Sequence, residues 1–252
     1  MPATIESANQ SMVPIIETIM ASRGGLPSNA RVLDFGCGVG RHTREFRAAG
    51  YQADGVDRPY DGLAEELASL PDRGLGVHLS SASGDFPFRD ATFDLCFSTS
   101  VLEHVMAYDQ PLSEIARVLK PGAWTLHIVP ARWRPIEPHM YTPLGGRFQQ
   151  PGLFRLWAKL GIRNEYQMTY SSAETAERNI RYSQTGINYP SRREIEAAFR
   201  RHFRRVEFVE REFIVATRSV SKVSRLAYPL IGFPGLPALY RGFHTRVILA
   251  RK

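Results

Sequence analysis

The sequence predicts an α/β fold built on one open, mainly parallel sheet. Three observations support this fold class. Apolar segments of strand length alternate with amphipathic segments of helix length, a glycine-rich turn joins the first strand to a helix, and 252 residues suffice for one large domain with insertions. The composition, with 43% hydrophobic and 23% charged residues, is that of a globular protein that can bury a core without disulfides.

The first half of the chain alternates regularly. A helix is predicted at 5–23, ended by a Gly-Gly-Leu-Pro break, and a strand at 31–35 then enters the glycine-rich turn. The remaining predicted elements are a helix at 41–49, a strand at 51–57, a helix at 63–70, strands at 77–82 and 93–98, a helix at 110–119 and a strand at 123–129. Five strands with helices between them are typical of a parallel sheet covered on both faces.

The pattern changes after residue 130. Residues 131–150 are rich in Pro, Gly, Arg and aromatic side chains. Two Ser-x-x-Glu capping boxes, beginning at Ser171 and Ser191, predict helix starts, and the second opens a core helix at 192–203. Two more strands are predicted at 206–215 and 245–249, with an unusually long connection, 216–244, between them.

Charge and apolar patterning restrict the partners and the location. The net charge is +7, from 32 basic and 25 acidic residues, and much of the excess lies at 192–211, where a solvated helix face is favoured over an anion-binding surface. We expect no DNA binding, and RNA binding is disfavoured. No signal peptide pattern and no apolar run of about 20 residues is found, so a cytoplasmic protein is predicted. Residues 216–244 predict a lid or dimer surface, with peripheral membrane contact as the alternative. The oligomeric state is not specified.

The strongest motif is the turn after the first strand, Val-Leu-Asp-Phe-Gly-Cys-Gly-Val-Gly at 32–40. Its glycines permit a sharp turn and let a ligand approach the backbone closely. Asp57, which ends the next strand 23 residues after Asp34, can accept hydrogen bonds from both hydroxyls of a ribose. The dinucleotide fingerprint requires a glycine three positions after Gly38, but Arg41 stands there, which argues against a nicotinamide cofactor.

Three further motifs follow in order: Ser-Gly-Asp-Phe-Pro-Phe at 83–88, Ser-Thr-Ser-Val-Leu-Glu-His-Val at 98–105 and Leu-Lys-Pro-Gly-Ala at 119–123. With the glycine turn and Asp57, they resemble the class I S-adenosylmethionine-dependent methyltransferases of the small-molecule type, the group described by the methyltransferase domain 11 profile. The resemblance covers about 30–130, with a weaker echo at 186–215. It implies a Rossmann-like, doubly wound, seven-stranded, mainly parallel sheet with the last strand antiparallel, helical lid insertions, and S-adenosylmethionine as the cofactor.

The resemblance also implies a domain organisation and a set of cofactor-binding residues. One methyltransferase domain spans 1–252. It comprises a helical segment (1–29), a cofactor-binding core (30–130), a substrate or lid insertion (131–190) and the C-terminal part of the sheet (191–252, including 216–244). The implied cofactor-binding residues are Asp34, Gly36, Cys37, Gly38, Asp57, Arg58, Asp85, Phe86, Ser98 and Thr99.

These residues have distinct implied roles. Asp34, Ser98, Thr99 and the backbone at 36–38 would face the methionine moiety, and Asp57 would hold the ribose. Arg58 would flank the adenine, Asp85 would accept from its amino group, and the Phe86 amide would lie nearby. Plainer alternatives are that Asp57 caps a strand, that Asp85 forms a turn and that Cys37 contributes only its backbone.

Candidate catalytic residues lie after the fourth and fifth strands, at the ligand-binding edge of such a sheet. His104 is the first candidate base, with helix capping or packing as the alternative. Glu137 and His139, in the segment Pro-Ile-Glu-Pro-His-Met, are the second candidates, as a base and its orienting group. The alternative there is a rigid, exposed turn. The two cysteines, Cys37 and Cys96, have no metal-ligand spacing, and no metal site is predicted.

The predicted function is methyl transfer to a small-molecule acceptor, with O-methylation of a glycan, glycolipid or natural-product intermediate favoured. The support is the basic and aromatic character of the segment after the fifth strand. An RNA or protein methyltransferase is the alternative enzyme, although no Asn-Pro-Pro-Tyr-type motif follows the fourth strand. A non-catalytic S-adenosylmethionine-binding scaffold is the alternative of another class.

Overall fold

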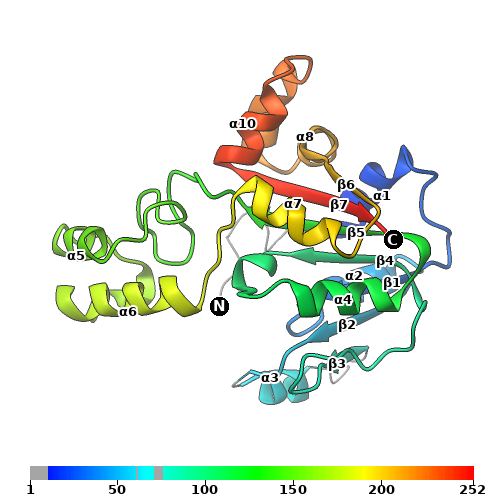
Figure 1. Ribbon diagram of the computed structural model, residues 1–252, viewed down its shortest axis with the longest axis horizontal. Helices are drawn as coiled ribbons and strands as arrows, with labels where there is room; N and C mark the ends of the chain where they lie inside the picture. Colours follow the sequence, from blue (N-terminus) through cyan, green and yellow to red (C-terminus); the bar gives the residue numbers. More distant parts are fainter. Residues whose placement is uncertain (1–10, 61, 71–75) are drawn as a thin grey trace.

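The computed structural model describes residues 11–60, 62–70 and 76–252, and a seven-stranded sheet lies at the centre of the molecule (Figure 1). The strands are β1 (Arg31–Phe35), β2 (Gln52–Asp57), β3 (Val77–Leu79), β4 (Phe93–Thr99), β5 (Leu119–Pro130), β6 (Arg205–Phe208) and β7 (Thr245–Arg251). Their order across the sheet is β3-β2-β1-β4-β5-β7-β6. Strands β1 to β5 pair in parallel, and β7 runs antiparallel to both β5 and β6. The predicted Rossmann-like architecture with an antiparallel last strand is therefore confirmed.

Helices cover both faces of this sheet. The α-helices are α1 (Met12–Ala21), α2 (Arg41–Ala48), α3 (Leu63–Ser69), α4 (Asp109–Val118), α5 (Pro151–Lys159), α6 (Ser172–Thr185), α7 (Arg192–Arg200), α8 (Glu210–Thr217), α9 (Lys222–Ala227) and α10 (Leu236–Phe243). The short 3-10 helices are η1 (Leu102–His104), η2 (Glu165–Gln167) and η3 (Tyr228–Leu230). One apolar cluster joins the sheet to α1, α2, α8 and α10, and a second joins it to α4 and α7.

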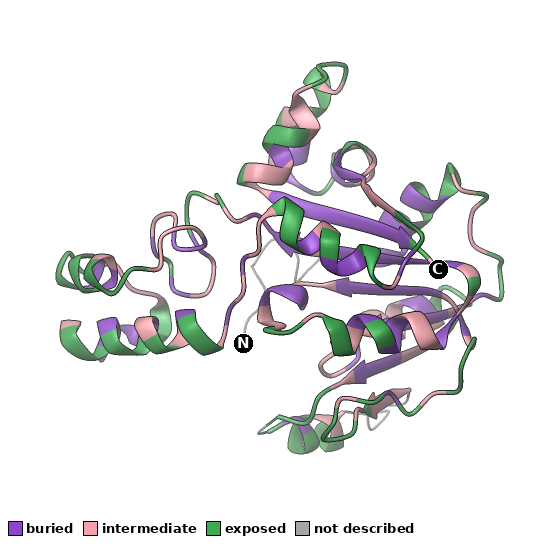
Figure 2. Ribbon diagram, in the orientation of Figure 1, coloured by how far each residue is buried: buried purple, intermediate pink, exposed green. Residues whose placement is uncertain are grey.

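The central strands form because their side chains are apolar on both faces, as a sheet covered on both sides requires. Val32 belongs to the first cluster and its neighbour Leu33 to the second. Figure 2 shows these strands as buried. At the start of α7 the predicted capping box is fully formed, since Ser191 accepts from the Glu194 amide and the Glu194 carboxylate accepts from the Ser191 amide.

The insertion between β5 and α7 forms a separate apolar cluster beside the sheet. Helices α5 and α6 pack against each other, and Phe154 and Trp157 are buried there. These two aromatic side chains therefore stabilise the insertion and do not present their rings to an acceptor. In Figure 1 the α5–α6 pair lies beyond the end of the sheet, on the side where β4 and β5 end.

The predicted strand at 206–215 is correct for 206–208 and wrong from Glu210 onward. Strand β6 ends at Phe208, and helix α8 begins at Glu210. The segment Phe-Ile-Val that suggested a strand instead places Phe213 and Ile214 on the core face of a helix. The buried Glu210 carboxylate accepts from the Val247 amide at 3.1 Å and from Arg241 at 2.8 Å, which ends the strand pairing and fixes the helix start.

Two other element boundaries differ from the prediction. The strand predicted at 77–82 stops at Leu79, because a turn closed by the Ser81 amide and the Asp85 carbonyl follows. Of the helix predicted at 5–23, α1 covers Met12–Ala21, and residues 5–10 lie outside the described residues.

The connection 216–244 is helical and only partly buried. Tyr240 packs in the core with its hydroxyl 2.9 Å from that of Ser224. Large apolar side chains of the same segment are exposed: Val220, Leu226, Tyr228, Leu230, Phe233, Leu239 and Phe243. Within the part of the chain that the structure describes, no helix combines the length and the apolarity that crossing a bilayer requires.

Candidate active site

The glycine turn after β1 is shaped by close packing on one side and open space on the other. Gly36, Gly38 and Gly40 all have positive φ, at 74°, 52° and 76°. A Cβ on Gly36 would lie 2.3 Å from Cγ2 of Val101, whereas a Cβ on Gly38 would meet only the Tyr60 hydroxyl at 3.8 Å. The turn therefore packs tightly on the segment that follows β4 and leaves the Gly38 backbone open to a ligand.

Asp57 holds the turn in place from the end of β2. Its carboxylate accepts from the Gly38 amide and from the Arg58 amide, each at 2.7 Å. Burial raises the pKa of Asp57, partly offset by these hydrogen bonds and by the charge of Arg58. A carboxylate offers about four lone-pair positions, so both oxygens can still accept from the two hydroxyls of a ribose.

Asp34 is buried behind the same turn. The Thr43 hydroxyl donates to its carboxylate at 3.1 Å. Burial raises its pKa to about 6, against the lowering effects of His42 and Thr43. Cys37, between the two glycines, packs its sulfur against Gly55, and burial raises the pKa of its thiol well above the usual range. The side chain of Cys37 is therefore buried and unreactive, and only its backbone can contact a ligand.

The third motif of the predicted cofactor site forms a turn whose polar groups contact other residues of the chain. Asp85 is exposed and accepts from the Ser83 hydroxyl at 2.5 Å, within a turn rich in serine. The Phe86 amide donates to the Glu114 carboxylate at 2.7 Å, so it is already engaged. The Phe86 ring packs on Phe35, with ring centroids 5.6 Å apart. The ring is therefore what Phe86 contributes to the packing near the glycine turn.

Ser98 is committed to a buried network that the sequence analysis missed. Its hydroxyl lies 2.7 Å from Nδ1 of His127, and the Thr125 hydroxyl lies 2.7 Å from Nε2 of the same ring. Burial lowers the pKa of His127 to about 3, so the ring is neutral. Side chains alternate across a strand, so Thr99 faces the opposite side of the sheet from Ser98. A histidine within an apolar strand was the signal for this network.

His104 lies in η1, directly after β4. Its Nδ1 is 2.8 Å from the Gly186 carbonyl oxygen, and because a carbonyl only accepts, Nδ1 carries the hydrogen. Burial lowers the pKa of His104. The ring is therefore neutral, with the lone pair on Nε2 available to bind a proton or another ligand.

Glu137 and His139 form a buried pair, which rules out the exposed turn. Glu137 is 1% exposed. Its carboxylate lies 2.6 Å from Nδ1 of His139 and accepts from the Tyr189 hydroxyl at 2.9 Å and from the His139 and Met140 amides at 2.9 and 2.6 Å. Burial works against charge on both partners, but these contacts prevail: the pKa of Glu137 is lowered and that of His139 is raised.

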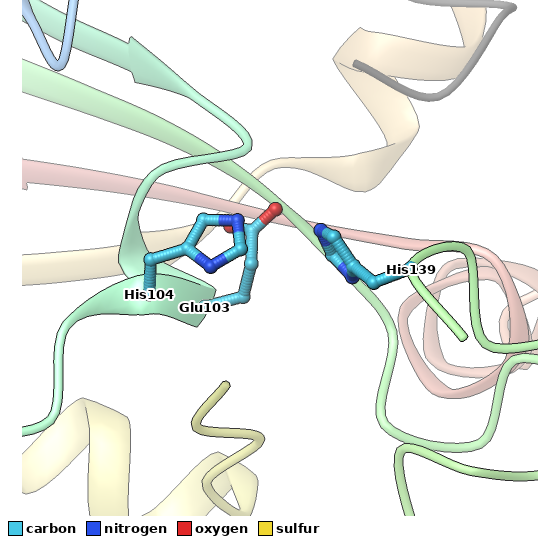
Figure 3. Close-up of side chains that lie close together, drawn as sticks. All are labelled: Glu103, His104 and His139. Atoms are coloured by element: carbon cyan, nitrogen blue, oxygen red, sulfur yellow. The ribbon is translucent and has the colours of Figure 1, made fainter. Parts of the chain in front are cut away.

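Glu103, which the sequence analysis did not select, completes a cluster with His104 and His139 (Figure 3). One potential ligand atom from each of the three lies within 4.8 Å of the other two. Glu103 is 1% exposed, and neither carboxylate oxygen has a hydrogen-bond partner of good geometry. Burial raises its pKa to about 7, although the Ser100 hydroxyl and its own backbone favour the ionised form.

Hydrogen bonds connect this cluster to the helical insertion. The Asn188 amide donates to the Glu103 carbonyl at 2.6 Å, and its side chain donates to the Val105 carbonyl at 2.9 Å. Together with the bond between His104 and Gly186, they fix the segment that leaves α6 against the segment that follows β4.

An open pocket of about 610 Å³ lies on the other side of His139. It is bounded mainly by η2 and α6, including Tyr182, whose ring centroid is 6.0 Å from that of His139. Charged side chains also line it: Glu174, Glu177, Arg178 and Arg181. The pocket therefore has a charged wall and is also lined by His139, one residue of the cluster.

Comparison with known proteins supports the assignment of the core. A family model described as a methyltransferase domain matches residues 33–126. A sterol 24-C-methyltransferase of Eremothecium gossypii is 36% identical over 110 residues, which are 42% of this chain and 30% of that protein. A malonyl-acyl-carrier-protein O-methyltransferase of Erwinia billingiae is 30% identical over 132 residues, 47% of this chain and 49% of that protein. The chain spans about half or less of the length of these curated relatives.

The crystal structure of the YcgJ protein from Bacillus subtilis matches nearly the whole fold. It has a TM-score of 0.51 and 15% identity, over 95% of this chain and 97% of that one. The fold is Rossmann-like, as in the class I S-adenosylmethionine-dependent methyltransferases, and the motif-bearing core is similar to that family. Residues 33–126 carry the methyltransferase domain, and S-adenosylmethionine is its cofactor.

The residues around the turn fit this cofactor. The open backbone at Gly38 leaves the space that a Cβ would fill, and Asp57 supplies acceptors for a ribose. The buried Asp34 favours a cationic neighbour such as the methionine ammonium, because its ionised form lacks solvent.

Proposed function

We propose that this protein transfers the methyl group of S-adenosylmethionine to an oxygen of a small polar acceptor: a glycan, a glycolipid or a natural-product intermediate. The observation that carries the proposal is the position of the two histidines. Val101, which packs on Gly36, directly precedes η1 with His104, and His139, whose ring centroid is 4.8 Å from that of His104, lines the pocket. An acceptor in the pocket would therefore contact His139, which lies beside His104 and near the glycine turn.

The cofactor supplies a methyl group on a positively charged sulfur. The chain's own residues have to align the acceptor oxygen with that methyl group and remove a proton from the oxygen. His104 is suited to the second task, because its Nδ1 donates to Gly186 and its Nε2 lone pair is available. Glu137 orients His139 through Nδ1 and leaves Nε2 of that ring for the acceptor.

The size of the pocket supports a small acceptor. Its volume of about 610 Å³ lies within the range of roughly 300–1,000 Å³ that small-molecule sites occupy. Its charged wall suits hydroxyl and acidic groups of a polar ligand.

The basic helix α7 gives little support to an RNA acceptor. Arg192 and Arg200 both pair with Glu196, at 3.6 and 2.7 Å. Arg201 pairs with Asp109 at 2.8 Å. Much of the positive charge on this helix is thus balanced by neighbouring carboxylates, as on a solvated helix face.

The test uses methyl-deuterated S-adenosylmethionine and untargeted mass spectrometry of a cell extract incubated with the purified chain. A labelled small metabolite or lipid, absent with the variant Asp57→Ala, is the expected result. Label found only in RNA or protein would contradict the proposal. Calorimetric binding of the cofactor without any labelled product would favour the non-catalytic scaffold.

We further propose that the exposed apolar part of 216–244 contacts the membrane surface, so that a cytoplasmic enzyme can meet a glycolipid. Leu226, Leu230 and Phe233 are more than half exposed, at 78%, 60% and 59%. Arg218 and Arg225 of the same segment can pair with anionic head groups. In a flotation assay with anionic vesicles, the wild type should float with the vesicles, and the variant Leu226→Ser/Phe233→Ser should not. Loss of self-association in that variant, without any flotation of the wild type, would identify a dimer surface instead.

A further inference from the structure

We propose that Glu103, His104 and His139 bind one divalent transition-metal ion, for which Zn²⁺ is the natural probe. The inference starts from Glu103. Its carboxylate is 1% exposed and neither oxygen has a hydrogen-bond partner of good geometry, although a buried carboxylate without such a partner is strongly destabilising. Figure 3 shows this carboxylate directed between the two imidazole rings.

The geometry can accommodate an ion with small adjustments. Because the three ligand atoms lie within 4.8 Å of one another, there is a position no more than about 2.8 Å from all three, which is 4.8 Å divided by the square root of three. Zinc bonds to nitrogen and carboxylate oxygen measure about 2.0–2.2 Å, so each side chain would move by less than about 1 Å.

The hydrogen bonds behind both imidazoles are those that metal ligands require. His104 donates from Nδ1 to the Gly186 carbonyl at 2.8 Å, and His139 from Nδ1 to the Glu137 carboxylate at 2.6 Å. In metal sites a ligating histidine almost always donates its other ring N–H to a carbonyl or a carboxylate, which fixes the tautomer and aims the lone pair at the ion. Here both Nε2 atoms are left for the ion.

The donor set also defines the class of ion. Two imidazoles and one carboxylate suit zinc and similar first-row divalent ions, whereas Mg²⁺ and Ca²⁺ prefer all-oxygen sites. Three protein ligands leave a coordination position open, as catalytic metal sites do. Since His139 also lines the pocket, an acceptor hydroxyl can occupy that position.

This role rests on the proposed methyl transfer, and it replaces proton removal by His104, because Nε2 of His104 would be bound to the ion. Coordination of the acceptor hydroxyl by the ion would favour loss of its proton to water. A lone pair of the resulting oxygen forms the bond to the methyl carbon, the methyl–sulfur bond breaks with its electron pair going to sulfur, and the neutral thioether leaves. Glu137 is then a positioning residue that acts through His139.

The experiment measures metal and cofactor binding on the same full-length protein after dialysis against a chelator. Titration calorimetry and elemental analysis should give one Zn²⁺ per chain. Glu103→Gln and His139→Gln should weaken binding by more than about 100-fold, and Glu137→Gln by about 10- to 100-fold. His202→Gln removes a histidine that also lies beside a carboxylate, Asp109 at 3.2 Å, and should bind zinc like the wild type.

The outcomes separate this proposal from the proposed function. Cofactor binding without stoichiometric zinc, equal zinc binding by wild type and Glu103→Gln, or preference for Mg²⁺ would each overturn the metal site. Stoichiometric zinc without cofactor binding would uphold the metal site and contradict methyl transfer. If Glu103→Gln does not fold by circular dichroism, His139→Gln decides, because its side chain is 10% exposed and lies at the pocket.

Discussion

Replacing His127 by glutamine should make the stability of this protein less sensitive to acid. The buried ring is held between Ser98 and Thr125, and burial lowers its pKa to about 3, whereas an unfolded histidine has a pKa of about 6.5. A lowered pKa in the folded state means that the contribution is complete above pH 6.5. It is lost progressively as the pH falls toward 3.

The magnitude follows from these two pKa values. Between pH 7 and pH 5 the unfolded chain binds nearly one proton at this histidine, while the folded ring binds almost none. At 1.36 kcal/mol per pKa unit, His127 should lower the free energy of unfolding by about 2 kcal/mol over that interval. Asp34 acts in the opposite direction, because its folded-state pKa is raised to about 6 and it adds stability as the pH falls. The effect of His127 must therefore be taken from the difference between the free energies of unfolding of the wild type and the variant at each pH.

Urea unfolding at pH 7, 6 and 5 provides the assay. His127→Gln should lose about 2 kcal/mol less than the wild type between pH 7 and pH 5. Ser98→Ala is the matched control, since it removes a hydrogen bond but keeps the buried imidazole, and it should retain the wild-type pH dependence. If His127→Gln and the wild type lose the same free energy, the ring does not remain neutral in the folded protein and the reasoning fails.

Three further substitutions test the cofactor turn and the buried pair. Gly36→Ala should lower the melting temperature, because its Cβ would lie 2.3 Å from Val101 in a backbone conformation with φ of 74°; overpacking of this kind costs about 1–3 kcal/mol. An unchanged melting temperature would show that the turn can shift. Asp57→Asn should weaken cofactor binding by about 10- to 100-fold in calorimetry, since it exchanges a charged acceptor for a neutral amide, and equal affinity would contradict the ribose contact. Tyr189→Phe removes the 2.9 Å hydrogen bond to Glu137 and should cost about 1–3 kcal/mol in chemical unfolding, while a neutral result would mean that the amides alone satisfy that carboxylate.

Local sequence predicted the cofactor turn well, because its chemistry is contiguous. A strand, three glycines and an acidic residue at the end of the next strand define most of that geometry within 32–57, and this segment lies almost wholly within the 33–126 match to the methyltransferase domain. Ser98 shows the limit of this reasoning. The motif names the residue, but the face to which its side chain points depends on the strand register and on His127.

Two other features depended on contacts that sequence patterns do not contain. The sequence predicts a strand where helix α8 lies, because Phe-Ile-Val is compatible with a strand and with a helix. The contact that decides between them joins Glu210 to the distant Val247 amide. The three-residue cluster joins residues 103 and 104 to residue 139 only after η1 and the loop after β5 meet at the sheet edge. Spacing rules for metal ligands assume short intervals on one element, so they could not detect it.

Hydrogen bonds join Gly186 and Asn188, which follow α6, to residues 103–105, and this affects how the α5–α6 insertion could be exchanged for another. The α5–α6 insertion has its own apolar cluster, separate from the two clusters of the sheet. The segment that follows α6, however, supplies the carbonyl that sets the tautomer of His104. A chimera that grafts a foreign insertion onto this core should therefore keep residues 186–188 of the present chain, because they hold His104 and the segment after β4 in place.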